Sequence, residues 1–251
     1  MASEGLIVRD LHRDDDPKFL DRFYGEVLAA SFRPEELDTL ESIADGLRGR
    51  DERVVLVSVA LGPSRQVLGG LVAERHRDSE VLLVGYLAVR PDQRGRGIGS
   101  ALMRRARAQW SADENIRLAL GEVHDPRRWE GVDPDDPMAR LRFFARLDAL
   151  LLDVPFIQPA LHPGGRRVPG FLLLAFYVDA SLSVNRGGQQ GIPAQVLSRF
   201  VRDYYEHVEK AKPPYDPELS SLLDRIEGTK TVPLLPLDLF RRNSQEFWDG
   251  T

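Results

Sequence analysis

The sequence predicts an α/β (α+β) protein with a mixed, mostly antiparallel central sheet, flanking helices and a C-terminal helical extension. Apolar runs and helical periods follow the order β-α-α-β-β-β-α-β-α-β-β up to about residue 180. Consecutive hairpins followed by a strand–helix–strand crossover favour a mixed sheet with helices packed on it. Beyond Asp179, a linker-like stretch leads into two helical patterns. We therefore expect a domain over residues 1–180 and the helical extension over residues 181–251.

The first half of the chain supplies a strand, two helices and two hairpins. The apolar run at residues 5–11 predicts a strand. Phe19, Phe23 and Val27 recur every four residues and predict a helix over Pro17–Ser31. Further patterns predict a helix from Pro34 and strands over Arg53–Leu61, Gln66–Arg75 and Glu80–Val89.

The second half alternates helical and extended patterns before the extension begins. Apolar residues at four-residue spacing predict a helix from Ile98 to Trp110. The remaining predicted elements are a strand over Ile116–His124, a loop over Asp125–Pro137, a helix over Met138–Leu152, strands over Val154–Gln158 and Val168–Val178, and helices around Pro193–Lys210 and Asp216–Glu227.

Composition excludes several classes of function. The chain has no cysteine, which rules out disulfides and thiolate chemistry, and its five histidines show no metal-ligand spacing, so we expect no metal. A net charge of −5 argues against nucleic acid as a partner. The longest apolar run, Phe171–Val178, is too short for a membrane span. The N-terminus has no signal-peptide pattern, so we expect a cytoplasmic protein.

A glycine-rich stretch between a predicted strand and a predicted helix is the strongest functional signal. Gly95, Gly97 and Gly99 occupy alternate positions, with Arg94 and Arg96 among them. Backbone N–H groups that converge at a helix N-terminus bind anions, and glycine lets a phosphate approach the backbone closely. Arginine adds charge-assisted hydrogen bonds to phosphate oxygens. These residues therefore predict a site for a phosphorylated ligand.

The spacing of this stretch separates it from two common phosphate-binding motifs. The third glycine of the dinucleotide fingerprint G-x-G-x-x-G is missing, and the P-loop lysine is absent. The stretch LAVRPDQRGRGIGSALM instead resembles the signature R/Q-x-x-G-x-G/A of the GNAT superfamily of N-acetyltransferases, and Arg94 to Gly99 match its spacing in full. The predicted order of elements over residues 5–180 is also similar to that of the family.

The resemblance implies acetyl-CoA as the cosubstrate and an amine of a small molecule or peptide as the acceptor, which attacks the thioester directly in a ternary complex. Backbone groups of the strand before the loop would pair with the pantetheine arm. The implied cofactor-binding residues are Leu87, Val89, Arg94, Gly95, Arg96, Gly97, Gly99 and Ser100.

The sequence departs from the family pattern at two positions. Where the family usually has an asparagine after the next strand, this chain has His124 and Asp125. Where the family usually has a tyrosine on the following helix, this chain has Phe144, which cannot protonate a leaving thiolate. Three functions stay open: acetyl transfer, transfer of a different acyl chain, and coenzyme A binding without catalysis.

The reaction also needs a group that accepts the proton of the amine. Glu122, on the strand after the loop, is the first candidate, and Tyr86 on the preceding strand is the second. Glu74 and His76, at the end of a hairpin strand, are further candidates for which an ordinary strand-end role is the simpler reading.

Residues on the acceptor side follow from the same resemblance. Gln158 and His162 flank the start of the connection between the last two strands, a region that often shapes the acceptor pocket in this fold. We expect Gln158 and His124 to contact the substrate. The predicted loop Asp125–Pro137 has a net charge of −3, which either draws a cationic amine or simply faces solvent.

The extension carries an apolar stripe at helical spacing, formed by Leu197, Phe200, Val201, Tyr204 and Val208. We expect this stripe to pack on the rest of the chain, and a homodimer contact is the alternative.

Overall fold

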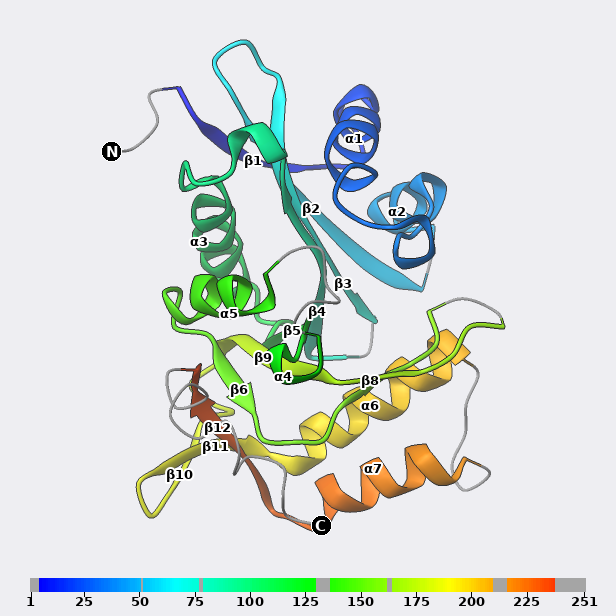
Figure 1. Cartoon of the computed structure of the whole chain (residues 1–251), viewed down its shortest axis with the longest axis vertical. Helices are drawn as coiled ribbons and strands as arrows, with labels where there is room; N and C mark the ends of the chain where they lie inside the picture. The colour runs from blue at the N-terminus through cyan, green and yellow to red at the C-terminus, as the bar shows by residue number, and fades with distance from the viewer. Residues whose placement is uncertain are drawn as a thin grey trace. The chain divides into compact units, whose positions relative to one another are not determined.

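The computed structural model describes residues 5–50, 52–76, 79–129, 136–161, 164–209 and 216–237. The chain forms two compact units, residues 1–116 and residues 117–251, which are described one at a time. The predicted class is confirmed, because helices flank sheets whose strands pair mostly antiparallel (Figure 1). Within the described ranges, no helix is long and apolar enough to cross a membrane.

The first unit contains a four-stranded antiparallel sheet. Its strands are β1 (Ile7–Leu11), β2 (Arg53–Leu61), β3 (Val67–His76) and β4 (Val81–Val89). They lie in the order β1-β2-β3-β4, so each strand after β1 pairs with its predecessor along the chain. The strands and hairpins that the sequence predicts in this region are confirmed.

Helices cover both faces of this sheet. They are α1 (Lys18–Phe23), a π-helical continuation at Tyr24–Leu28, α2 (Leu40–Leu47) and α3 (Ile98–Trp110). Side chains of a strand alternate between the two faces. Accordingly, Val57 and Val59 of β2 pack in one core cluster with α1 and α2, whereas Ala60 packs with Ile98 and Leu102 of α3.

The helix predicted from Pro34 is wrong in its extent. Pro34–Glu36 forms only a 3₁₀ turn, and α2 begins at Leu40. Thr39 is extended (φ −67°, ψ 150°), and its side chain accepts a 3.1 Å hydrogen bond from the N–H of Ser42. Because threonine is a good N-cap, this local bond favours a new helix start over a continuous helix.

A bulge interrupts the pairing of β3 and β4. Val72 pairs with Tyr86 and Ala73 pairs with Val84, so the register skips Gly85. Such a bulge bends a strand and increases its local twist. The bend lies four residues before Val89, where β4 ends and leads to the glycine-rich stretch.

The second unit contains a six-stranded sheet and a separate two-stranded ladder. The sheet strands are β5 (Leu118–His124), β6 (Leu150–Leu152), β9 (Phe171–Val178), β10 (Val184–Arg186), β11 (Gln189–Pro193) and β12 (Thr231–Pro236). They lie in the order β5-β9-β6-β12-β11-β10, with antiparallel pairing. The ladder joins β7 (Ile157–Gln158) to β8 (Val168–Pro169).

In the described part of this unit, the helices are α4 (Pro126–Trp129), α5 (Pro137–Ala145), α6 (Ala194–Glu209) and α7 (Pro217–Glu227). Helix α5 packs on β5, α6 packs on β11 and β12, and α7 packs on α6. The apolar stripe of α6 is buried in this unit, since Leu197, Phe200, Val201 and Tyr204 are at most 5% exposed.

Four predicted elements of this unit need correction. The helix predicted over Met138–Leu152 is too long. Helix α5 ends at Ala145, and the apolar residues Leu150–Leu152 form β6. The predicted loop Asp125–Pro137 contains α4, while its residues 130–135 lie outside the described residues. The strand predicted over Val154–Gln158 is reduced to Ile157–Gln158. The strand predicted over Val168–Val178 is divided at Gly170 into β8, which pairs with β7, and β9, which pairs with β5 and β6. A short apolar run explains the first error, because periodicity alone does not separate a buried strand such as Leu150–Leu152 from a helix.

The extension after residue 180 is not only helical. Its two predicted helices are confirmed as α6 and α7, but β10, β11 and β12 also lie in it. Strand β12 pairs with β6 on one side and β11 on the other. The boundary at residue 180 was based on sequence character and stays a prediction.

Candidate functional site

The glycine-rich stretch forms an open turn that leads into α3, and we call Arg94–Ser100 the glycine loop. After β4 a 3₁₀ turn spans Pro91–Gln93, and the loop follows. Gly95 and Gly97 have φ of +77° and +79°, the left-handed region that side chains of other residues rarely adopt. Gly97 is also the N-cap residue of α3. The two glycines therefore give the loop a turn that few other residues could make.

The backbone N–H groups of the glycine loop are available as hydrogen-bond donors within the described part of the chain. No side chain caps α3, and its first turn has no acidic residue. Among the described residues, none accepts a hydrogen bond from the backbone N–H groups of residues 95–100. A Cβ atom placed on Gly95 or Gly97 would meet no atom of the described residues within 4 Å. Free N–H groups at the positive end of a helix dipole suit an anion.

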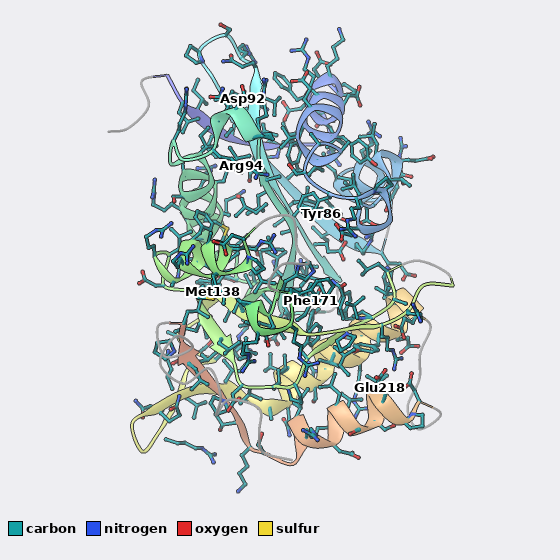
Figure 2. The ribbon with its side chains drawn as sticks, viewed as in Figure 1. Tyr86, Asp92, Arg94, Met138, Phe171 and Glu218 are labelled. Carbon is teal, nitrogen blue, oxygen red and sulfur yellow. The ribbon has the colours of Figure 1, made fainter. Side chains whose placement is uncertain are left out.

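Arginines add positive charge to this loop, and Figure 2 labels Arg94 and Asp92 there. Arg94 and Arg96 are exposed. Arg90 is paired with Asp92 at 3.1 Å. Hydrogen bonds from the Gln93 amide and then from Arg90 hold the pKa of Asp92 below its usual value. Asp92 therefore offsets the charge of Arg90. The Arg94 Nε donates a 3.4 Å hydrogen bond to the carbonyl of Val89.

Leu87 and Val89 lie on β4 just before the loop. They pair with Leu71 and Gly69 of β3, respectively. Their side chains pack against the cluster that contains Ile98 of α3. Core packing of the side chains leaves a main-chain role for both residues possible, and that role stays a prediction.

The second base candidate, Tyr86, is tied to the backbone of a neighbouring segment. Its hydroxyl accepts a 2.9 Å hydrogen bond from the N–H of Asp38 and donates a 3.1 Å bond to the carbonyl of Glu36. Its ring lies edge-on to Phe32, with centroids 5.1 Å apart. Burial, and then the charge of Asp38, raises the pKa of Tyr86. This geometry suits holding the segment before α2 and does not suit accepting a proton.

The first base candidate, Glu122, meets the predicted substrate residue Gln158 in the second unit. The Gln158 Nε2 donates a 2.7 Å hydrogen bond to Glu122 Oε2. The Tyr204 hydroxyl of α6 lies 3.4 Å from the same oxygen. The structure thus brings together two residues predicted separately, on β5 and β7, and adds Tyr204, whose ring is only 4% exposed.

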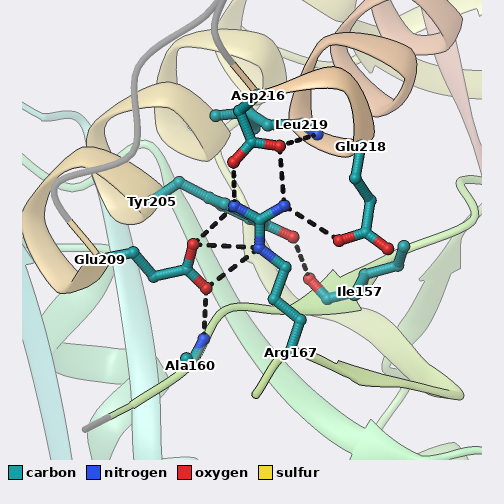
Figure 3. A network of polar contacts seen from close by, with 8 residues as sticks. All are labelled: Ile157, Ala160, Arg167, Tyr205, Glu209, Asp216, Glu218 and Leu219. Carbon is teal, nitrogen blue, oxygen red and sulfur yellow. Dashed lines mark hydrogen bonds and ion pairs between the residues drawn. The ribbon is translucent and has the colours of Figure 1, made fainter. Parts of the chain in front are cut away.

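A second tyrosine of α6 holds the strand that carries Gln158. The Tyr205 hydroxyl donates to the carbonyl of Ile157, and burial raises the pKa of this hydroxyl. The Arg167 guanidinium lies over the Tyr205 ring, 4.8 Å from its centroid (Figure 3). Arg167 in turn binds three carboxylates, those of Glu209, Asp216 and Glu218. We call these four charged residues the Arg167 network.

His124 lies in an aromatic cluster at the end of β5. Its ring stacks on Trp129, with centroids 4.1 Å apart and planes 14° apart, and it lies 4.6 Å from Phe171. The Trp129 indole N–H donates a 3.0 Å hydrogen bond to the carbonyl of Gly170. The predicted contact of His124 with a substrate stays a prediction.

The remaining predicted residues have simpler settings. Glu74 forms a 2.6 Å ion pair with Arg53, which supports its strand-end role. Phe144 is 7% exposed and packs on Phe176, with ring centroids 4.7 Å apart. His162 and the side chain of His76 lie outside the described residues.

Sequence reasoning missed Tyr204, Tyr205 and Arg167. Tyr204 belongs to the predicted apolar stripe of this helix, and Tyr205 directly follows it. The ring of Tyr204 is enough to explain its place in the stripe, so the pattern predicts no role for its hydroxyl. A buried tyrosine hydroxyl usually has a polar partner, so a tyrosine in an apolar pattern predicts a hydrogen bond inside the protein. The identity of that partner depends on distant parts of the chain.

Part of the chain matches a known protein family. Residues 51–147 match the family model described as acetyltransferase (GNAT) domain. The matched segment contains the glycine loop, Glu122 and Phe144, whereas Gln158 and Tyr204 lie beyond it. No curated protein matches the chain.

Solved structures give matches of low identity. A putative acetyltransferase from GNAT family of Bacteroides thetaiotaomicron is 20% identical, with a TM-score of 0.49, and the match covers 70% of this chain and 89% of that one. The ribosomal-protein-S18-alanine N-acetyltransferase of Escherichia coli is 14% identical, with a TM-score of 0.46 and coverage of 70% and 96%.

Proposed function

We propose that the chain is an acetyl-CoA-dependent N-acetyltransferase of the GNAT superfamily, on the premise that residues 51–147 match the acetyltransferase (GNAT) domain. In this proposal a primary amine of a small molecule or peptide attacks the acetyl group directly in a ternary complex. The observation that carries the proposal is the uncapped start of α3, where the N–H groups of residues 95–100 have no acceptor among the described residues.

The glycine loop is proposed to hold the diphosphate of coenzyme A. Its N–H groups and the α3 dipole supply partial positive charge, and Arg94 and Arg96 supply full charges. Glycine at positions 95 and 97 lets a phosphate approach the backbone closely, because no Cβ intervenes. A Cβ at either position would meet no described atom within 4 Å, so neither glycine is required by packing. The proposed backbone partners of the pantetheine arm are Leu87 and Val89.

Glu122 is proposed to accept the proton that the amine loses. Acetyl-CoA supplies the acetyl group as a thioester, and the chain must supply the proton acceptor, because an amine is mostly protonated near pH 7. The Gln158 amide binds one carboxylate oxygen of Glu122 and fixes its position. Gln158 therefore supports the carboxylate, in addition to the acceptor contact that the sequence suggests.

The alternative function is coenzyme A binding without acetyl transfer, and Phe144 favours it. Its side chain is buried against Phe176 and has no proton to give to a leaving thiolate. A thiolate is a tolerable leaving group near neutral pH, since a free thiol has a pKa of about 8.5. Catalysis can therefore proceed if water or another group supplies this proton.

Thiol release from acetyl-CoA, measured against a panel of small amines and peptides, tests the proposal. Amine-dependent release supports acetyl transfer. Binding of coenzyme A without release by any amine supports the alternative, and release only from a longer acyl-CoA supports a different acyl donor. Absence of coenzyme A binding would overturn both functions.

A further inference from the structure

Helix α6 points two neighbouring buried tyrosines at the candidate base and at the strand beside it. The Tyr204 hydroxyl lies 3.4 Å from Glu122 Oε2, and the Tyr205 hydroxyl donates to the Ile157 carbonyl. The two residues are 4% and 1% exposed, respectively. Successive residues of a helix are roughly 100° apart around its axis, so the two rings reach different targets.

Two donors from different elements converge on one oxygen of Glu122. Gln158 Nε2 lies at 2.7 Å and the Tyr204 hydroxyl at 3.4 Å. An ionised carboxylate only accepts hydrogen bonds, so both groups act as donors to its charged form. The Tyr204 contact is long for an O–H···O bond and is the weaker of the two.

The strand that carries Gln158 is also held from α6. Ile157 directly precedes Gln158 in β7, and β7 pairs with β8. Arg167 directly precedes β8, is 16% exposed and lies over the Tyr205 ring. Figure 3 shows the Arg167 guanidinium surrounded by its three carboxylate partners. Beside it, the Tyr205 hydroxyl is hydrogen-bonded to the Ile157 carbonyl. Both strands of the ladder are thereby fixed to the C-terminal part of α6 and the start of α7.

We propose that Tyr204 is a positioning residue for Glu122, so that α6, beyond the matched domain at residues 51–147, forms part of the catalytic apparatus. This inference rests on the proposed function of Glu122. Tyr204 holds the carboxylate oxygen in place and stabilises its ionised form. The competing role is packing alone, since the Tyr204 ring also stacks near Phe200, with centroids 5.6 Å apart.

Tyr204→Phe tests this role, because it removes the hydroxyl and keeps the ring. We expect kcat to fall about 3- to 10-fold, as for the loss of one hydrogen bond of about 1 kcal/mol. The acid limb of the kcat profile should move to higher pH, since the ionised carboxylate loses a donor. The KM for acetyl-CoA should be unchanged. Tyr177→Phe is the matched control, because its hydroxyl bonds Asp179 in the same unit, at 3.2 Å.

A double variant separates this inference from the proposed function. If Tyr204 acts through Glu122, Tyr204→Phe should change kcat no further when Glu122→Gln is already present. Full turnover in Glu122→Gln would overturn the proposed base, and this inference with it. Loss of turnover in Glu122→Gln, combined with a wild-type rate and pH profile in Tyr204→Phe, would overturn the inference alone. If Tyr204→Phe lowered kcat by the same factor in wild type and in Glu122→Gln, its role would be packing alone. A lowered denaturant midpoint of unfolding in Tyr204→Phe would support that role independently.

Discussion

Gln158 and Glu122 are joined by a 2.7 Å hydrogen bond between an amide on β7 and a carboxylate on β5. The two residues are 36 positions apart in the sequence. The sequence predicts Glu122 as the base and Gln158 as a contact of the acceptor. Their contact places the candidate base beside the residue expected to face the acceptor. The amide N–H can donate to an ionised carboxylate, which only accepts hydrogen bonds.

Glu122→Gln should lower kcat by at least about 100-fold, because an amide cannot accept the proton of the amine. The acid limb of the pH–rate profile should disappear, while coenzyme A binding is retained. Steady-state kinetics between acidic and alkaline pH measure both effects. Glu227→Gln, which removes the charge of an exposed partner of Arg202, is the control and should leave the rate unchanged. An unaltered pH profile in Glu122→Gln would remove this residue as the base.

Gly97→Ala should weaken coenzyme A binding at least tenfold, because a Cβ at this position would hinder the close approach of a phosphate to the loop backbone. The substitution also strains a backbone at φ +79°, at a cost to folding of about 1 kcal/mol. Gly188→Ala is a matched control, since Gly188 has φ +87° and an equally open surrounding. Titration calorimetry and thermal unfolding of both variants separate binding from stability. Equal coenzyme A affinity in the two variants would contradict the role of the loop.

Tyr86→Phe should destabilise the fold by about 1–2 kcal/mol, because the N–H of Asp38 loses its acceptor. Burial raises the pKa of Tyr86, so the stability from its neutral hydroxyl is complete below the usual tyrosine value of about 10. It is lost as the pH rises through the raised pKa. Denaturant unfolding at neutral and alkaline pH should therefore show a difference from wild type that shrinks as the pH increases. Tyr24→Phe, in the same unit, is the control.

Asp216→Asn should destabilise the second unit by about 1–2 kcal/mol at neutral pH, because a charge-assisted bond to Arg167 is lost. Asparagine keeps the side-chain oxygen that caps α7 at the N–H of Leu219. The hydrogen bond from Arg167 lowers the pKa of Asp216, so this stability is complete above the usual aspartate value of about 4 and is lost as the pH falls through the lowered pKa.

Unfolding of wild type and Asp216→Asn across acidic pH measures this dependence. The difference between the two proteins should vanish at low pH. Asp224→Asn, an exposed substitution on the same helix, should show a difference near zero at every pH. A constant difference between wild type and Asp216→Asn would mean that the charge of Asp216 contributes nothing.

Elements with a long, regular pattern were predictable from the sequence. The four-residue spacing from Ile98 to Trp110 predicts α3, which spans these two residues. The glycine loop was also predictable, because its ligand-binding features belong to consecutive residues at one strand-to-helix transition. Such features need no knowledge of distant contacts.

Strand β12 shows why other elements were not predictable. Its sequence TVPLLP contains Pro233 and Pro236, and proline seldom occurs inside a paired strand because it has no N–H to donate. Here Pro233 pairs with Gly191, and its carbonyl accepts a 3.1 Å bond from the N–H of Asp153. The pairing is decided by partners 40 and more residues away, as is the contact of Tyr204 with Glu122.

The position of β12 between β6 and β11 has a consequence for synthesis of the protein. The sheet of the second unit stays open along β6 until residues 231–236 have emerged from the ribosome. An open strand edge is a template for pairing with other chains. A nascent chain that stalls before residue 231 therefore exposes an unpaired strand edge that favours aggregation. We expect chaperone dependence to be greatest until residues 231–236 have been synthesised.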